Sequence, residues 1–343
     1  MQPILVLVGG FLGAGKTSLM LAAAARLRAS GRRVGLLTND QAGELVDSAL
    51  VRAEGFESGE ITGGCFCCRF SDFLAAAGEF TQPDVLLAEP VGSCADLAAT
   101  VIRPLQRLYP ERFRIAPLTV LVDPRRAEQL LAAGADPHMS YLFRSQLAEA
   151  DIVCYTKADL HPVTPPDGRR LSAVTGEGLD EWLHEVLTST DAVGRRTLDI
   201  DYALYADAEA ALGWLNLAAD FRSRRRLTPA AVAGPLLDSI DQDLTRRELA
   251  IAHLKVLVRS ASGWVKAGIC ENGQEPLVDG MLDASPASRH EILLNLRACA
   301  DPVLLVTVAA VGLAQPDGRV QIRSRAAFRP APPRPEHRIT ETV

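Results

Sequence analysis

Short apolar runs alternate with helix-like patterns through residues 1–190. The runs predict buried strands over Ile4–Val8, Val34–Thr38, Val85–Glu89, Leu118–Asp123 and Ile152–Thr156. The patterns between them predict helices that include Thr17–Ala29, Ala95–Leu108 and Arg125–Ala133. Strands that alternate with helices form βαβ units. This region is therefore predicted to be an α/β domain with a mostly parallel sheet.

From Asp199 onward the pattern changes to that of a smaller α+β domain. Strands are predicted over Leu212–Ala218, His253–Val258, Trp264–Cys270 and Val303–Val311, and helices over Pro229–Leu249 and Ser285–Cys299. The order β-α-β-β-α-β is that of a ferredoxin-like domain. We place this domain at residues 199–328 and expect it to recognise a partner. Four prolines within residues 329–343 predict a disordered tail.

Composition narrows the class of protein. The 343 residues are 48% hydrophobic and 23% charged, which is ordinary for a globular protein. A formal net charge of −6 argues against a nucleic-acid partner, whose phosphates would favour a basic surface. No apolar run approaches the ~20 residues that span a bilayer, and the apolar N-terminus lacks the basic segment and cleavage site of a signal peptide. We therefore expect a cytoplasmic protein with no membrane and no nucleic-acid partner.

The strongest chemical signal is the sequence GFLGAGKT at Gly10–Thr17. It fits the phosphate-loop pattern G-x-x-x-x-G-K-[ST] and lies between a predicted strand and a predicted helix, the context that this pattern requires. Glycines let backbone N–H groups face phosphate oxygens, Lys16 would neutralise the phosphates, and Thr17 would ligate Mg²⁺. The predicted nucleotide contacts are Gly10, Gly13, Ala14, Gly15, Lys16, Thr17 and Ser18. The alternative is a chance glycine-rich turn, but the context favours a P-loop nucleoside triphosphatase.

A second motif bears on the choice of base. Residues 156–159 read TKAD at the carboxyl end of a predicted strand, where ligands bind in open α/β sheets. A carboxylate at Asp159 can accept two hydrogen bonds from the guanine N1–H and amino group, whereas adenine offers no such pair of donors. The predicted base contacts are Thr156, Lys157 and Asp159, together with Ser172 and Ala173 of the SAVTG segment. The alternative is a turn in which Asp159 caps a helix.

Glu89 ends a predicted central strand, and Gly92 follows three residues later. A carboxylate beside a P-loop is placed to hold Mg²⁺ or the attacking water. Gly92 could bend toward the γ-phosphate and sense its hydrolysis. Lys16, Glu89 and Gly92 are therefore the predicted catalytic residues. The alternative for Glu89 is an ordinary acid at a strand end.

Polar residues also follow the second predicted strand, where a switch segment would reach the metal. They are Asn39, Asp40 and Asp47. Asp40 is therefore a further candidate Mg²⁺ ligand beside Thr17 and Glu89. Taken singly, each of these loop residues is better explained as a solvated polar group than as a metal ligand.

Three cysteines lie within four residues in the sequence GGCFCC, at Cys65, Cys67 and Cys68. Thiolates bind soft or borderline cations such as Zn²⁺, Co²⁺ or Cu⁺, and three of them would need a fourth ligand from elsewhere or from water. The clustering indicates a reducing compartment. A redox switch and simple packing are the alternatives. The other cysteines, Cys94, Cys154, Cys270 and Cys299, are predicted to be structural, and no histidine is predicted to be a ligand.

The motifs GGFLGAGKTS, TNDQAGE, GGCFCC, LLAEPVG and ADIVCYTKADL occur in this order over about residues 3–185. Together they resemble the CobW-like GTPases, which belong to a larger group with the HypB, UreG and MeaB-type proteins. The resemblance implies a metal chaperone or insertase whose GTP hydrolysis gates metal binding and release. It implies a metal motif at Cys65, Cys67 and Cys68, and nucleotide motifs at Gly10–Thr17, Glu89 and Thr156–Asp159.

The chain departs from the family pattern in several places. Thr156 stands where the guanine motif usually has Asn, and Pro90 and Val91 stand where the family often has two threonines. The segment after the second strand reads NDQAGE instead of the common NEFGE, and a histidine-rich run is absent. These differences concern base selectivity, switch timing and metal identity more than membership of the family.

The motifs and the resemblance predict a GTP-hydrolysing metallochaperone. It would use Mg²⁺, bind Zn²⁺ or Co²⁺ at the cysteines and deliver the metal to a client metalloprotein, and it could form a homodimer. One alternative is a regulatory GTPase that gates a client, such as a corrinoid enzyme, without carrying metal. Another is a small-molecule kinase that uses ATP.

Overall fold

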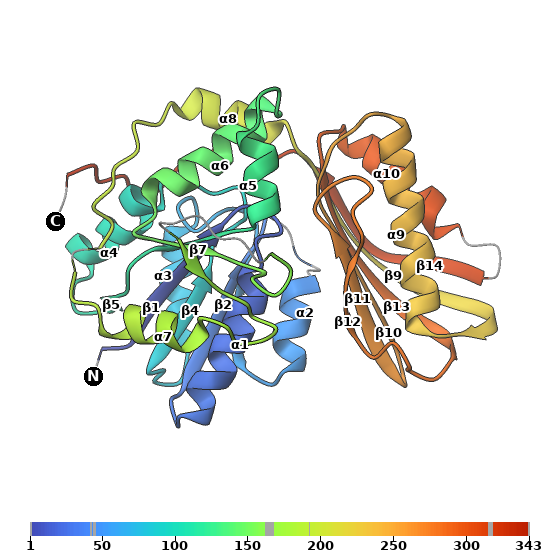
Figure 1. Ribbon diagram of the computed structural model, residues 1–343, viewed down its shortest axis with the longest axis horizontal. Coiled ribbons are helices and arrows are strands. Elements are labelled where there is room, and N and C mark those ends of the chain that lie inside the picture. The colour runs from blue at the N-terminus through green and yellow to red at the C-terminus, as the bar shows by residue number, and fades with distance from the viewer. Residues whose placement is uncertain are drawn as a thin grey trace. The chain divides into compact units, whose positions relative to one another are not determined.

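The computed structural model describes residues 2–41, 43, 46–161, 168–191, 193–314 and 318–341 (Figure 1). The chain divides into two compact units. The first comprises Met1–Gln41, Leu50–Ala208 and Pro332–Val343, and the second comprises Ala42–Ala49 and Glu209–Ala331. Residues 42–49 and 332–343 thus belong to a different unit from the residues that precede them in sequence.

A parallel sheet forms the centre of the first unit. Its strands have the order β3-β2-β4-β1-β6-β7-β8, and β5 also pairs with β1. They are β1 (Ile4–Gly10), β2 (Val34–Asn39), β3 (Glu57–Ile61), β4 (Val85–Glu89), β5 (Arg114–Ile115), β6 (Thr119–Val122), β7 (Ile152–Tyr155) and β8 (Arg169–Arg170). Because these pairs are parallel, the carboxyl ends of β1, β2, β4, β6 and β7 lie along one edge. The predicted α/β fold is confirmed.

Helices connect these strands. They are α1 (Lys16–Ala29), α3 (Phe70–Glu79), the π-helix η1 (Ala98–Ile102), α4 (Arg103–Leu108), α5 (Pro124–Leu131), α6 (Pro137–Glu149) and α7 (Leu179–Thr188). Two more, α2 (Val46–Ala53) and α8 (Tyr202–Ala210), extend across a boundary between the units. No helix in the described part of the chain combines the length and apolar character that a bilayer span requires.

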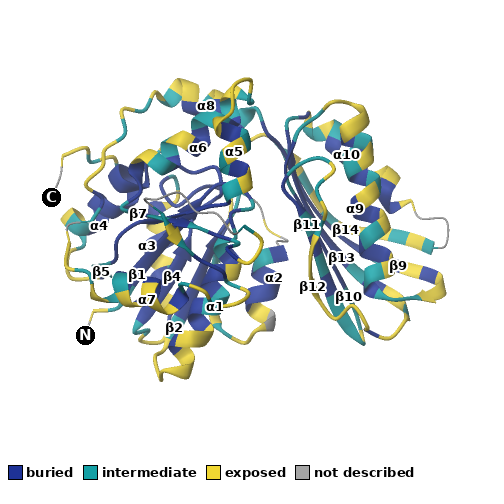
Figure 2. Ribbon diagram, viewed as in Figure 1, coloured by how far each residue is buried: buried dark blue, intermediate teal, exposed yellow. Residues whose placement is uncertain are grey.

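The core of the first unit is aliphatic and fixes the edge of the sheet that carries the motifs. Strands β1 and β4 are almost wholly buried, as their dark blue ribbons in Figure 2 show. Leu19 of α1 and Trp182 of α7 are buried in one cluster with Val6 of β1. The Trp182 indole N–H donates to Thr119 Oγ1 at 3.0 Å, so its polar atom is satisfied.

The second unit is an antiparallel sheet with two helices. The strands, in the order β12-β11-β10-β13-β9-β14, are β9 (Gly213–Leu227), β10 (Ile251–Ser260), β11 (Gly263–Ile269), β12 (Leu277–Gly280), β13 (Ala287–Ala298) and β14 (Gly318–Phe328). The helices are α9 (Pro229–Arg246) and α10 (Pro302–Leu313). Alternate residues of β9, such as Leu215 and Leu217, share a buried cluster with Leu236 of α9 and Leu305 of α10. Both helices therefore cover the same face of the sheet.

Two segments have the opposite structure from the one predicted. The predicted helix over Ser285–Cys299 is strand β13, and the predicted strand over Val303–Val311 is helix α10. β13 is buried throughout Ile292–Ala298 between two neighbouring strands, so it lacks the alternation that identifies a strand. α10 is rich in valine, but the Asp301 carboxylate caps its N-terminus by accepting from the Val303 N–H at 2.8 Å.

The ferredoxin-like order is present with these corrected elements. β9, α9, β10, β13, α10 and β14 follow one another as β-α-β-β-α-β, and β13 lies between β9 and β10. β11 and β12 extend the sheet beyond β10. The α+β fold class predicted for this region is confirmed.

The C-terminal residues differ from the predicted disordered tail. Residues 332–341 contain no helix or strand, but they are held by hydrogen bonds within the first unit. The Glu336 N–H donates to Cys67 O at 2.9 Å and the Ile339 N–H to Ala99 O at 2.8 Å. Prolines remove backbone donors, yet the residues between them still bond to the folded domain. Thr342 and Val343 lie outside the described residues.

Candidate functional site

The predicted phosphate loop connects β1 to α1. Gly10, Gly13 and Gly15 have φ angles of 135°, 82° and 92°, which side chains rarely adopt. A Cβ atom on Gly10 would lie 2.6 Å from Leu121 O, so the first glycine is also required by close packing. The Lys16 ammonium donates to Gly10 O at 2.8 Å and therefore lies across the loop. This is the strand–loop–helix geometry that cradles phosphates.

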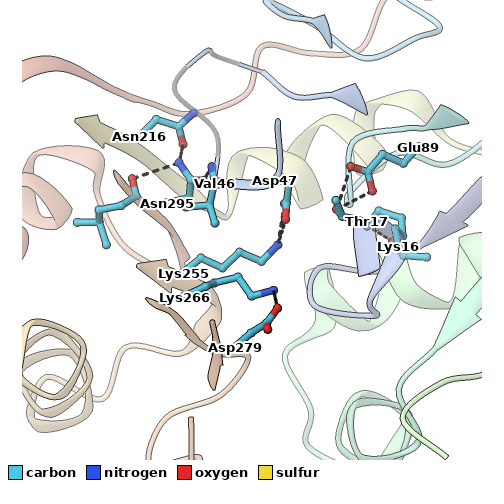
Figure 3. A network of polar contacts seen from close by, with 12 residues as sticks. Lys16, Thr17, Val46, Asp47, Glu89, Asn216, Lys255, Lys266, Asp279 and Asn295 are labelled. Atoms are coloured by element: carbon cyan, nitrogen blue, oxygen red, sulfur yellow. Dashed lines mark hydrogen bonds and ion pairs between the residues drawn. The ribbon is translucent and has the colours of Figure 1, made fainter. Parts of the chain in front are cut away.

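Thr17 and Glu89 meet beside this loop. The Thr17 hydroxyl is 3.0 and 2.9 Å from the two carboxylate oxygens of Glu89, as Figure 3 shows. Both residues are buried, with exposed fractions of 8% and 5%. A hydroxyl and a carboxylate are oxygen ligands of the kind that Mg²⁺ prefers. These two side chains therefore fit a Mg²⁺ ion held next to the phosphates.

Gly92 lies against the same lysine. A Cβ atom added to Gly92 would be 3.2 Å from Lys16 Nζ and 2.7 Å from a methyl carbon of Leu12. Gln146 fixes the loop by donating to the carbonyls of Gly92 at 3.1 Å and Cys94 at 2.8 Å. Lys16, Glu89 and Gly92, predicted separately as catalytic residues, are thus brought to one place.

The TKAD segment contacts the phosphate loop at one end. The Thr156 hydroxyl donates to Ala14 O at 2.9 Å. Lys157 has a φ of 56°, and its ammonium is 2.6 Å from Asp123 Oδ2. Asp123, at the end of β6, was not predicted as part of the site, although its place at the carboxyl edge of the sheet is the signal that could have identified it.

Asp159 lies at the other end of the segment. Its side chain accepts from the Ser172 hydroxyl at 2.5 Å. Ser172 Oγ in turn accepts from the N–H groups of Val174 and Thr175 at 3.2 and 3.1 Å. Asp159, Ser172 and Ala173 are therefore neighbours, as a base-binding face requires.

Asn39 connects the end of β2 to the cysteine turn, residues 64–68. Its amide donates to Gly64 O at 2.8 Å and Ile61 O at 3.0 Å, and its Oδ1 accepts from the Phe66 N–H at 3.0 Å. With an exposed fraction of 7%, the Asn39 side chain is buried and connects β2 to the turn, so it is not the solvated polar group considered above. The Asp40 N–H donates to Ile61 O at 3.1 Å, so Asp40 follows directly at the same edge.

Asp47 belongs to the second unit. Its carboxylate pairs with the Lys255 ammonium at 2.6 and 2.7 Å (Figure 3). The neighbouring Val46 N–H donates to Asn295 Oδ1 at 2.9 Å, and Arg259 donates to Ala49 O at 2.9 Å. Residues 46–49 are therefore bound to strands β10 and β13.

The three cysteines of the turn lie together. Cys65 Sγ is 2.7 Å from Cys67 Sγ and 3.3 Å from Cys68 Sγ, and the last two sulfurs are 3.7 Å apart. All three sulfurs lie within 4.8 Å of one another. Cys65 and Cys67 are buried and Cys68 is half-buried. The three sulfurs are close enough together to bind a single metal ion.

Hydrogen bonding divides the thiols into one acceptor and its donors. Hydrogen bonds from Cys67, Cys68 and Cys94 hold the pKa of Cys65 well below its ordinary value. The hydrogen bond to Cys65 raises the pKa of Cys67 and raises that of Cys68 to about 12. The group therefore favours one thiolate at Cys65 surrounded by protonated thiols.

Cys94 is a fourth thiol at this site and was predicted to be structural. It is 1% exposed and lies in the loop after β4, two residues beyond Gly92. β4 pairs with β2, the strand whose last residue holds the cysteine turn. The neighbouring strand ends were the signal that could have placed Cys94 near Cys65. All seven cysteines are free thiols.

The comparison with protein families identifies the family of the nucleotide-binding domain. The model of the CobW/HypB/UreG nucleotide-binding domain matches residues 4–175. The chain belongs to this family. It is accordingly a CobW-like P-loop GTPase, and the predicted family and GTPase activity are confirmed.

Two solved structures resemble the chain at low identity. Zinc-bound YjiA GTPase from E. coli is 13% identical, with 92% of this chain and 100% of that chain covered and a TM-score of 0.34. The hydrogenase maturation factor HypB from Archaeoglobus fulgidus is 19% identical, with 53% and 87% covered and a TM-score of 0.38. Both TM-scores are below 0.5, so the assignment rests on the family match. No curated protein matches the sequence.

Proposed function

We propose that this CobW-like GTPase is a metallochaperone that binds Zn²⁺ or Co²⁺ at Cys65, Cys67 and Cys68 and releases it to a client metalloprotein as GTP is hydrolysed. One observation carries this proposal. Three thiol sulfurs lie within 4.8 Å of one another, in a turn that Asn39 bonds to the end of β2 in the nucleotide-binding domain. A metal-ligand set is thereby attached to the edge of the sheet that carries the phosphate loop.

The nucleotide roles follow from the geometry of the loop. Lys16 and the loop N–H groups hold the phosphates, and Asp159 accepts the guanine donors with support from Ser172. Thr17 and Glu89 would hold Mg²⁺, which would supply charge neutralisation at the phosphates. Gly92 lies beside the Lys16 ammonium, so it would be near a bound γ-phosphate and could respond to its loss.

The cysteine turn supplies three thiolates, and Cys94 is placed to supply a fourth donor. Metal binding requires deprotonated thiols, so a metal ion displaces the protons that Cys67 and Cys68 hold. Four sulfurs would form a closed site, whereas three would leave a position for a client's ligand. If Cys94 moved away with its loop, the closed four-sulfur site would become an open three-sulfur site. This change would favour transfer of the metal to the client.

The same edge of the sheet leads to the second unit. Asn39 holds the cysteine turn, Asp40 follows it, and residues 42–49 belong to the second unit, where Asp47 pairs with Lys255. We propose that the second unit recognises the client, and that residues 46–49, which bond to its strands, take part in its response to the nucleotide.

Metal-dependent GTP turnover tests the proposal. We expect zinc or cobalt to change the turnover of the wild-type chain and to have no effect on the triple variant Cys65→Ser, Cys67→Ser, Cys68→Ser. Cys94→Ala should weaken zinc binding by about 10–100-fold, whereas the control Cys270→Ala, another buried thiol, should leave it unchanged. A GTPase that gates its client without carrying metal predicts equal turnover and no bound metal in all of these proteins.

A further inference from the structure

The C-terminal strap, residues 334–340, crosses the cysteine turn. The Arg334 N–H donates to Cys68 Sγ at 3.1 Å, and the Glu336 N–H donates to Cys67 O at 2.9 Å. An N–H directed at a sulfur favours the thiolate over the thiol. The strap therefore contacts two of the proposed metal ligands, one through its sulfur and one through its backbone.

Glu336 anchors the strap on α3, which begins at Phe70 just after the turn. The Glu336 carboxylate accepts from the Ser71 hydroxyl at 2.6 Å and from the Ser71 N–H at 3.2 Å. A carboxylate at a helix N-terminus is favoured by the helix dipole. The His337 ring packs edge-on against the Phe70 ring, with centroids 5.1 Å apart. These contacts hold the strap over the side of the turn that faces α3.

A second anchor lies on the loop that follows β4. Arg338 Nε donates to Asp96 Oδ2 at 2.7 Å, and the Asp96 side chain is 1% exposed. The Ile339 N–H donates to Ala99 O at 2.8 Å, and Arg103 donates to the carbonyls of Ile339 and Thr340 at 3.1 and 2.9 Å. The same loop contains Gly92, which lies beside the Lys16 ammonium. The strap is thus bonded both to the cysteines and to the loop nearest the phosphates.

We propose that the C-terminal strap closes the cysteine site and must lift before a metal ion can enter or leave, with the Arg338–Asp96 pair linking its position to the nucleotide-bound loop. The identity of the cargo rests on the proposed function, but the closure does not. The strap bonds to the Cys68 sulfur and crosses the turn, and its anchors, exposed Ser71 and buried Asp96, lie outside the strands of the sheet, so the bonds to them can break without unfolding the sheet. Opening would expose Cys67 and Cys68 together.

Thiol labelling of the full chain without metal tests the closure directly. Iodoacetamide modification of Cys67 and Cys68 is followed by mass spectrometry in the wild type, Glu336→Ala and Ser71→Ala. Loss of the charge-assisted hydrogen bond should accelerate labelling by about tenfold in both variants. Glu341→Ala is the matched control, because Glu341 follows the strap in sequence and forms an exposed ion pair with Arg107. Labelling at the wild-type rate in both Glu336→Ala and Ser71→Ala would overturn the proposal.

The link to the nucleotide has its own readout. A non-hydrolysable GTP analogue should change the labelling rate of Cys68 in the wild type and leave it unchanged in Arg338→Ala. An equal response in both proteins would overturn the role of the Arg338–Asp96 pair. Zinc transfer to a chelator separates this proposal from the proposed function. If zinc binds but the labelling rate is the same in the strap variants as in the wild type, the strap proposal is wrong and the metallochaperone proposal is retained. If zinc does not bind but the strap variants are labelled faster, the metallochaperone proposal is wrong and the strap proposal is retained.

Discussion

The Thr17 hydroxyl donates to the carboxylate of Glu89, with its oxygen 2.9 and 3.0 Å from the two carboxylate oxygens. This bond joins the first turn of α1 to the end of β4, two elements that are distant in sequence and meet at the carboxyl edge of the sheet. It places two oxygen ligands beside the phosphate loop and orients Thr17 before a metal ion binds. The arrangement makes Glu89 the carboxylate whose loss should be felt most in Mg²⁺-dependent hydrolysis.

Glu89→Gln tests this role with a neutral side chain of the same shape. We expect GTP turnover to fall by about 10–100-fold and the Mg²⁺ concentration at half-maximal rate to rise, because a charged ligand near the ion is lost. Steady-state kinetics across a Mg²⁺ titration measure both quantities. Glu79→Gln, an exposed acid at the end of α3, is the control. Equal Mg²⁺ dependence in the two variants would remove Glu89 from the metal site.

Asp159→Asn tests base recognition. The substitution replaces one of the two acceptor oxygens of the carboxylate by an NH₂ group, which can only donate. GTP binding should therefore weaken by about a hundredfold. Xanthosine triphosphate, which carries a carbonyl where guanine has an amino group, should bind the variant better than it binds the wild type. Calorimetry with GTP, ATP and xanthosine triphosphate checks this order. Unchanged selectivity in the variant would assign guanine recognition to other residues.

Asn39→Asp separates the donor and acceptor functions of the Asn39 side chain at the cysteine turn. The carboxylate retains the acceptor for the Phe66 N–H and loses the donor to the Gly64 and Ile61 carbonyls. Zinc affinity should fall by about tenfold, the effect typical of residues that orient metal ligands. Competition with a zinc chelator measures the affinity. If the Asn39→Asp variant bound zinc as tightly as the wild type, Asn39 would not position the turn.

The buried carboxyl group of Glu149 should make the free energy of unfolding depend on pH. It is fully buried at the end of α6, and burial raises its pKa from 4.5 to about 8, opposed by a hydrogen bond from the Ala98 N–H. Because the folded protein holds this proton and the unfolded chain releases it, the contribution is fully present below pH 4.5 and is lost as pH rises through about 8. The slope cannot exceed about 1.4 kcal/mol per pH unit.

Glu149→Gln should flatten this slope. Chemical denaturation at pH 5.5 and pH 7.5 gives the free energy of unfolding of the wild type and the variant. The wild type should lose more stability between the two values than the variant does, because glutamine has no proton to release. Parallel changes in the two proteins would show that Glu149 is ionised in the folded state.

The sequence predicted those parts of the fold that obey one local rule. The buried strands β1, β2, β4, β6 and β7 are continuous apolar runs, and the phosphate loop has a fixed spacing. β3 was not predicted because Glu57–Ile61 is an edge strand with mostly polar residues, of which only Ile61 is buried. β13 and α10 were exchanged because burial on two faces removes the period of a strand, and a valine-rich run outweighed the helix cap at Asp301.

The site residues were predictable where one motif holds them and not where the fold assembles them. Cys65, Cys67 and Cys68 are a single turn, so their proximity is visible in sequence. Cys94 and the strap residue Arg334 approach that turn only through the order of the strands and the path of the C-terminal segment. No local spacing encodes either approach, and proline content alone predicted disorder where backbone hydrogen bonds hold the chain.

Metal analysis with and without a non-hydrolysable GTP analogue tests the central claim most directly. The purified chain, loaded with zinc and dialysed, should retain about one ion per chain, held by thiolates. The Cys65→Ser, Cys67→Ser, Cys68→Ser variant should retain none, and the analogue should change the zinc affinity of the wild type. Equal metal content in wild type and variant, or an affinity that is the same with and without the analogue, would contradict a GTP-controlled metal site.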